Sequence, residues 1–304
     1  MTTGVLEPVV QPPRASRSSR RAAAAPSSGA AIIVLRTLYA FAALMIWFVV
    51  YALVFGAVQE SRSQSVLYAQ FRQQLAAGVA PSGGLIKAGK PVALLEIPRL
   101  GIHDVVVEGT SPGTLLLGPG HRADSPLPGE VGVSVVYGRG ATFGAPFGHL
   151  VNLHQGDAID VIDAVGTFHY VVDDVRRAGS PLPVPLAATG SRLTLASATG
   201  AGLRATVAPS APFYVDATMH GGALAEPGGR VASVPSSNKV MGVDGGAFAS
   251  LVRWLQLLFL MTVAAGWLYT RWGRWQTWLV AVPAVGAALW LVTETAFRLL
   301  PNLL

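Results

Sequence analysis

The sequence contains no cysteine in its 304 residues. Without a thiol the chain can form no disulfide, no thiolate metal site and no cysteine nucleophile, whatever compartment it occupies. Charged residues are also scarce, at 12%, and the basic side chains do not alternate with aromatic ones in the manner that binds single-stranded nucleic acid. These absences exclude thiol chemistry and indicate that nucleic acid is not a partner.

Apolar residues, by contrast, make up 51% of the chain, and long apolar runs predict helices that cross a membrane. The uncharged run 37–58 is long enough, at ~1.5 Å per residue, to span a hydrocarbon core of ~30 Å. It is also longer than the apolar part of a signal peptide, which indicates an anchor that is not cleaved. We predict membrane helices at 31–58, 247–270 and 275–297.

The basic residues predict how these helices are oriented. The tail 1–30 is rich in arginine, and the short loop 271–274 contains arginine and no acidic residue. Cytoplasmic segments carry the excess of Lys and Arg, so both segments are assigned to the cytoplasm. The region between the first two helices and the tail 298–304 are then extracytoplasmic, which predicts a multi-pass plasma-membrane protein with its N-terminus inside.

The remaining segments differ in composition. The Ala-, Ser-, Pro- and Arg-rich tail 1–30 is predicted to be disordered. Segment 59–88 has apolar residues at helical spacing, which predicts a stalk helix and a linker; a solvated extension of the membrane helix is the alternative. Segment 89–218 contains short β-branched stretches between turns and predicts a barrel or sandwich, while 219–246 is Gly-, Ser- and Pro-rich and predicts a flexible linker. The predicted strands include 102–107, 158–163, 167–173, 192–196, 204–208 and 213–217.

Several short motifs in segment 89–218 occur in the order and spacing of a known family. They are Leu94–Ile102, Val106–Thr110, Leu115–His121, Phe143–Phe147, Gly156–Asp157 and Leu193–Thr199. Together they resemble the sortases, cysteine transpeptidases of Gram-positive cell surfaces, and most closely class E. The resemblance implies a mainly β fold, an eight-stranded β-barrel with a groove between strands, here joined to one N-terminal and two C-terminal transmembrane helices.

The resemblance also implies where the catalytic residues would stand. Ala198 occupies the position of the nucleophilic cysteine, Arg139 that of the catalytic histidine, and Arg204 that of the arginine that steadies the substrate. Covalent catalysis needs a nucleophile and a proton carrier. Ala198 supplies no nucleophile, and Arg139 cannot accept a proton near neutral pH because its ordinary pKa lies above ~12. The catalytic set is therefore not intact, which predicts a pseudoenzyme.

A replacement nucleophile is one alternative to that interpretation. Ser197 and Thr199 flank the cysteine position, but strand alternation directs their side chains to the opposite face. A serine would also need a base, and His149 and His154 lie well beyond the histidine position, on the predicted turn after Phe147.

A second alternative gives the arginines a binding role. On the family's barrel Arg139 and Arg204 would face one groove, and paired guanidinium groups suit a carboxylate or a phosphate; otherwise Arg139 points to solvent. We predict no cofactor and no metal site, because Asp157, Asp160 and Asp163 are interpreted as solvated turn acids rather than calcium ligands.

Two further features belong to this region. The extended stretch 181–185, with three prolines, is predicted to form a wall of the groove or else a rigid spacer. Asp173 and Asp174, followed by Arg176 and Arg177, predict ordinary surface ion pairs that contribute little to stability.

The leading hypothesis is a non-catalytic membrane protein that binds a surface-protein segment or a membrane partner, such as a sortase or a pilus or secretion component. It would thereby assist protein sorting or assembly in the cell envelope. The alternatives are an active sortase-like transpeptidase or peptidase with a non-cysteine nucleophile, and a structural membrane subunit that acts through its helical hairpin. The Ala-, Arg-, Gly- and Pro-rich composition indicates a GC-rich genome, and hence a Gram-positive, actinobacterial source.

Overall fold

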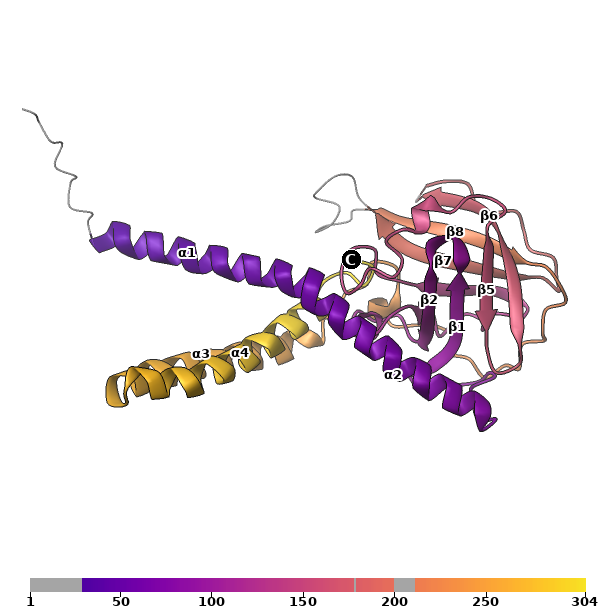
Figure 1. Cartoon of the computed structure of the whole chain (residues 1–304). Coiled ribbons are helices and arrows are strands. Elements are labelled where there is room, and N and C mark those ends of the chain that lie inside the picture. Colours follow the sequence, from indigo (N-terminus) through magenta and orange to yellow (C-terminus); the bar gives the residue numbers. More distant parts are fainter. Residues whose placement is uncertain (1–28, 178, 200–210) are drawn as a thin grey trace, which may run out of the picture. The chain divides into compact units, whose positions relative to one another are not determined.

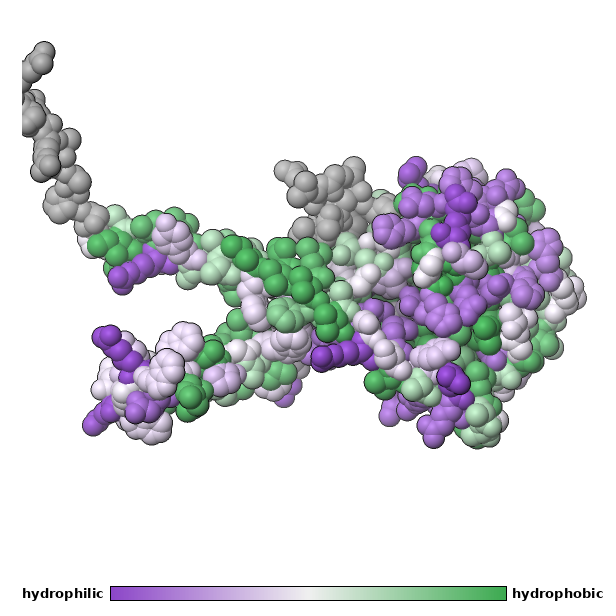
Figure 2. Space-filling model, viewed as in Figure 1, coloured by the Kyte–Doolittle hydropathy of each residue, from purple (hydrophilic) through white to green (hydrophobic). Residues whose placement is uncertain are grey.

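The computed structural model describes residues 29–177, 179–199 and 211–304 (Figure 1). The chain forms two compact units, residues 1–45 and 46–304. In the first unit the described residues belong to helix α1 (Gly29–Val50), whose large apolar side chains are exposed along its length (Figure 2). A helix that is apolar on all sides and exposed is suited to a lipid environment rather than to water.

Among the described residues, three helical segments are long and apolar enough to cross a membrane, namely 31–76, 247–271 and 274–298. The first comprises α1, a π-helical turn at Tyr51–Phe55 and α2 (Gly56–Ala76). The other two are α3 (Ala247–Arg271) and α4 (Arg274–Arg298), which form a hairpin. The prediction of one N-terminal and two C-terminal membrane helices is confirmed.

Helix α2 continues the first membrane helix without a break and packs one face against the barrel. Leu67 and Phe71 are buried in a cluster with three residues of the barrel strands, Leu94, Val105 and Val107. Nearby, Gln64 accepts a hydrogen bond from the backbone N–H of Val105 and donates to the backbone oxygen of Leu117. The helix is therefore neither separate from the first membrane helix nor fully solvated.

In the part of the chain that the structure describes, eight strands form a closed barrel in the order β1-β2-β3-β4-β7-β8-β6-β5, which confirms the predicted fold. The strands are β1 (Pro91–Ile97), β2 (Ile102–Glu108), β3 (Gly120–His121), β4 (Gly132–Tyr137), β5 (Ala158–Ile162), β6 (Thr167–Arg177), β7 (Ser191–Thr199) and β8 (Ala211–Met219). The predicted strand 204–208 lies outside the described residues. Strand β6 runs on to Arg177, four residues beyond the predicted end at 173, because it continues to pair with β8.

Strand β7 positions the candidate site through its two faces. Leu193 and Leu195 point into the main core of the barrel. Ala196 and Ala198 belong to a separate cluster on the other face. Strand β7 pairs in parallel with β4, in a register that sets Ala196 opposite Tyr137. This alternation, with a period of two residues, places residue 198 outside the barrel core.

Residues 219–246 were predicted to be a flexible linker, and the structure shows that they are attached to the barrel. Leu224 bridges to Glu130, and the backbone oxygen of Asn238 accepts a hydrogen bond from Thr110 at 2.6 Å. Val240 and Met241 pack against the cluster that contains Ala198. The segment contains little regular secondary structure apart from the 3-10 turn Ser236–Asn238, but its composition does not prevent tertiary contacts.

Candidate functional site

The position of the expected nucleophile is covered by other parts of the chain. Ala198 is 3% exposed and shares an apolar cluster with Leu115, Tyr137, Ala196 and Leu303. The loop that follows β4 lies directly against the end of β7, since a Cβ on Gly140 would come within 2.2 Å of the carbonyl oxygen of Ala198. Glycine is thus required at position 140 for the two segments to approach.

Arg139 lies in the same loop and is completely buried. Its Nη1 donates to the backbone oxygen of Leu304 at 3.0 Å and to Thr142 Oγ1 at 3.1 Å. Its Nη2 donates to the backbone oxygen of Pro112 at 3.0 Å. The guanidinium carbon also lies 5.2 Å from the ring centroid of Phe143. Both terminal nitrogens of the guanidinium are therefore bonded to the protein itself and not to solvent, while Nε has no partner among the described residues.

Burial lowers the pKa of Arg139 to about 9. A base with that pKa is still overwhelmingly protonated at pH 7, so the side chain remains a cation and cannot accept the proton of a nucleophile. Hydrogen bonds from a charged donor to three acceptors offset part of the cost of removing this charge from water. The chemistry that the site retains is that of a hydrogen-bond donor to oxygen.

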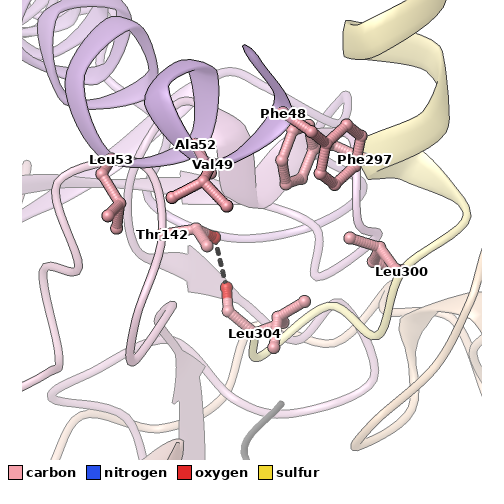
Figure 3. Close-up of a pocket in the computed structure, with 8 residues that line it drawn as sticks. All are labelled: Phe48, Val49, Ala52, Leu53, Thr142, Phe297, Leu300 and Leu304. Carbon is pink, nitrogen blue, oxygen red and sulfur yellow. Dashed lines mark hydrogen bonds between the residues drawn. The ribbon is translucent and has the colours of Figure 1, made fainter. Parts of the chain in front are cut away.

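The segment after α4 covers Ala198 and Arg139. The backbone N–H of Gly140 donates to the oxygen of Leu303 at 3.0 Å, and Thr142 Oγ1 donates to the oxygen of Leu304 at 2.6 Å (Figure 3). The side-chain amide of Asn302 donates to the backbone oxygens of Thr110 and Lys239, at 2.8 and 2.9 Å. Asn302 and Leu303 are completely buried.

A small apolar cavity of about 50 Å³ lies beside this segment (Figure 3). It is lined by Phe48, Val49, Ala52, Leu53, Thr142, Phe297, Leu300 and Leu304. Its volume suits no more than a few water-sized molecules, and its lining offers almost no polar group. The cavity is therefore a packing gap between the helix ends and the segment after α4, not a ligand site.

A larger, open groove of about 480 Å³ lies on the outer face of β4, β7 and β8. Its lining residues include Val133, Val135, Tyr137, Thr194 and Tyr214 from the strands, with Arg122, Arg176 and Leu182. Leu182 belongs to the stretch 181–185 that was predicted to form a groove wall. Burial acts to lower the pKa of Arg122, but its bonds to Tyr137 and Asp124 outweigh this and raise it, so this cation is firmly charged.

Arg176 does not form the predicted surface pair with its neighbours in sequence. It binds the fully buried carboxylate of Asp216, which also accepts a hydrogen bond from Thr194 Oγ1 at 2.6 Å. The pairing of β6 with β8 sets Asp216 opposite Asp174. The partner is thus chosen by strand register, which separation along the sequence does not reveal.

The other candidate residues do not lie together in the structure. Ser197 is buried on the core side of β7, and its Oγ has no hydrogen-bond partner within the described residues. His149 and His154 are exposed, and His121 is held between Glu108 and the oxygen of Pro126. Arg204 and the side chain of Thr199 lie outside the described residues.

The three acidic residues that were interpreted as solvated turn acids rather than calcium ligands all have protein partners. Asp157 pairs with Arg99, Asp160 with His169, and Asp163 accepts from the backbone N–H groups of its own turn. Over residues 29–177, 179–199 and 211–304, no cluster of three or more His, Asp or Glu side chains could hold a metal ion.

Sequence reasoning missed the segment 301–304 as part of the site. A signal was present: Leu303 and Leu304 follow Arg298 and Pro301, so they cannot extend the membrane helix and must bury their side chains elsewhere. The sequence did not indicate where in the fold these two side chains would be buried.

A closed β-barrel with this site, joined to membrane helices, agrees with the comparison to known families. Residues 95–197 match the family model of the sortase domain. This stretch of the chain is thus similar to a sortase domain. Among curated proteins, none matches the sequence.

Solved sortases also align with the chain. Sortase E from Streptomyces avermitilis is 28% identical, with a TM-score of 0.37, and the alignment covers 51% of this chain and 100% of that one. A class D sortase transpeptidase from Clostridium perfringens is 21% identical, with a TM-score of 0.42 and coverage of 54% and 99%. Sortase A from Corynebacterium diphtheriae is 21% identical, with a TM-score of 0.39 and coverage of 55% and 92%.

Proposed function

We propose that this protein is a membrane-anchored sortase-fold protein without transpeptidase activity. It binds a surface-protein segment or a membrane partner and thereby assists sorting or assembly in a Gram-positive, actinobacterial cell envelope. The observation that carries the proposal is how the chain surrounds Ala198 and Arg139, the residues at the two expected catalytic positions. Ala198 is covered by Leu303, and Arg139 is bonded to the oxygens of Leu304 and Pro112.

The chemistry of the site supports the loss of activity in two ways. No residue of the chain is a thiol, and the cation at position 139 remains protonated at neutral pH, so it cannot activate a substitute nucleophile. Ser197, the nearest hydroxyl on β7 with a described side chain, is buried with its Oγ unpaired, so no base is in place to activate it.

The same geometry supports binding. A barrel that retains hydrogen-bond donors and an apolar surface at this position can hold an extended peptide without cleaving it. The open groove beside it, with Arg122 and Arg176 in its lining, offers a second stretch of surface to a bound chain.

The test of activity uses the full chain in detergent micelles, with sorting-signal peptides and an amine nucleophile, beside an active sortase as the positive control. We expect no transpeptidation and no hydrolysis above the level without protein. Turnover that disappears in the S197A variant would refute the proposal and establish a serine enzyme.

The test of binding uses crosslinking in membranes and compares two variants, R139A and a deletion of 254–293. Loss of crosslinked partners in R139A alone supports binding at the barrel, and loss in the deletion alone supports the membrane hairpin. Partners unchanged in both variants would contradict both modes of binding.

A further inference from the structure

The segment Pro301–Leu304 contacts the barrel as a bound peptide does. Its partners, Thr110, Gly140, Thr142 and Arg139, are all remote from it in sequence. The contacts combine backbone oxygens, one side-chain amide and one buried aliphatic side chain, which is the usual division of labour in peptide recognition: backbone bonds supply affinity, and pockets supply specificity.

Each contact defines what a ligand at this place must offer. The pocket of Leu303, formed with Leu115, Tyr137 and Ala198, requires a branched aliphatic side chain. The preceding position faces two backbone oxygens and requires a side-chain donor, which Asn302 supplies. The backbone oxygen of the following residue, Leu304, accepts a hydrogen bond from Arg139. The resident segment is itself a turn, closed by a hydrogen bond from the N–H of Leu304 to the oxygen of Pro301 at 3.2 Å. The site therefore selects a turn in which an amide side chain precedes an aliphatic one.

The fit of the segment is incomplete, which makes exchange feasible. The Oδ1 of Asn302 and the Nε of Arg139 are both buried and have no hydrogen-bond partner among the described residues. A buried polar atom without a partner costs ~1–3 kcal/mol. A competing ligand that supplies an acceptor to the Nε of Arg139, and that has a partner for its own amide oxygen, would gain hydrogen bonds that the resident segment lacks.

The position of α4 controls how available the segment is. Phe297, at the end of α4, stacks on Phe48 with ring centroids 4.4 Å apart and meets Phe143 edge-on at 5.1 Å. Phe143 in turn lies under Arg139. The segment begins only a few residues after this aromatic contact. While the helix ends stay packed together, the effective concentration of the segment at the site is therefore high, and this concentration falls if the helix ends separate.

We infer that the surface beside Ala198 and Arg139 is a peptide-binding site whose resident ligand is the chain's own Pro301–Leu304, and that a partner peptide with an asparagine before a branched aliphatic residue replaces it. This inference rests on the proposed function, because it treats the surface as a place where a peptide is bound and not cleaved. It adds to that function the class of ligand and the means by which access is controlled.

Because the chain has no cysteine, a single introduced thiol reports on the site without ambiguity. The full chain with A198C, in detergent micelles, is reacted with a small maleimide, and the rate is compared with that of V165C, which lies on an exposed turn. We expect A198C to react at least about tenfold more slowly, since it reacts only when the segment opens. Adding L303D, which places a charge in the aliphatic pocket, should raise the A198C rate about tenfold or more and leave the V165C rate unchanged.

The ligand class is tested by adding a synthetic peptide with the sequence of residues 299–304 to the A198C/L303D variant. Protection of the thiol by this peptide, and not by a scrambled peptide of the same composition, is the expected result. Equal A198C rates with and without L303D, or no protection by the peptide, would overturn the inference. If L303D lowers the thermal unfolding temperature sharply, the milder L303A replaces it, and a rate that does not rise would again contradict the inference.

These outcomes are separable from those of the proposed function. Peptide turnover by the unmodified chain refutes the proposed function, whatever the labelling rates are. Unchanged labelling refutes the resident ligand and leaves the absence of turnover standing.

Discussion

Arg139 donates a hydrogen bond from Nη1 to the backbone oxygen of Leu304 over 3.0 Å, across 165 positions of sequence. The bond joins the loop after β4 to the segment after α4, so it connects the barrel to the end of the last apolar helix. Thr142 donates to the same oxygen. The side chain at position 139 thus binds the chain's own backbone.

Replacing Arg139 by lysine should destabilise the protein although the charge is kept. A lysine has a single nitrogen, which cannot serve the oxygens of both Leu304 and Pro112 as the two Nη atoms do. We expect R139K to lower the free energy of unfolding by ~1–3 kcal/mol, the cost of leaving a buried acceptor unpaired. Urea denaturation in detergent measures it, and T142V, which removes one donor to the same oxygen, should cost less. A stability equal to that of the unmodified chain would contradict the buried role of the guanidinium.

Phe297 is expected to be a principal anchor of the helix ends. It is buried against Phe48, Tyr51 and Phe143, so F297A should cost on the order of 3–5 kcal/mol, as do other buried Phe-to-Ala changes. The matched control is F259A on α3, because Phe259 is 67% exposed. Thermal unfolding in the same detergent compares the two. Equal effects in both variants would mean that the aromatic cluster does not hold α4 in place.

The carboxylate of Asp216 is expected to be essential to the wall formed by β6, β7 and β8. It is fully buried and bonded to Arg176 and to Thr194, and removing one partner of a buried pair leaves the other charge uncompensated. D216A should therefore lower the free energy of unfolding by ~3–5 kcal/mol. The control D174A, at an exposed position that only caps its neighbour's backbone N–H, should change it by less than ~1 kcal/mol. A small effect of D216A would show that the pair is solvated.

The orientation in the membrane is tested with single cysteines in intact cells. The arginine-rich hairpin loop predicts that W272C reacts with a membrane-impermeant thiol reagent only after the cells are permeabilised. V165C, in the barrel, should react without permeabilisation. Both side chains are exposed to the same extent, 55%, so accessibility within the protein does not bias the comparison. The reverse pattern would invert the proposed topology.

Local patterns in the sequence were sufficient for the architecture. The membrane helices follow from the length of uncharged runs, and the barrel follows from short β-branched stretches between turns, since both signals depend on residues near one another in the chain. The same locality explains the errors. Arg176 was paired with its neighbours, yet strand register gave it Asp216. Segment 219–246 was judged flexible from its composition, yet Asn238 and Val240 are bound to the barrel.

The absence of a thiol was determined by the sequence alone, and so were the apolar lengths that suit a membrane, because composition and run length need no fold to be read. Only the tertiary structure decided that Arg139 faces the oxygen of Leu304 instead of an open groove, and that Leu303 packs in the same cluster as Ala198. A buried donor bonds to an acceptor that the folded chain places within about 3 Å. For Arg139 that acceptor is the oxygen of Leu304, which is distant in the sequence.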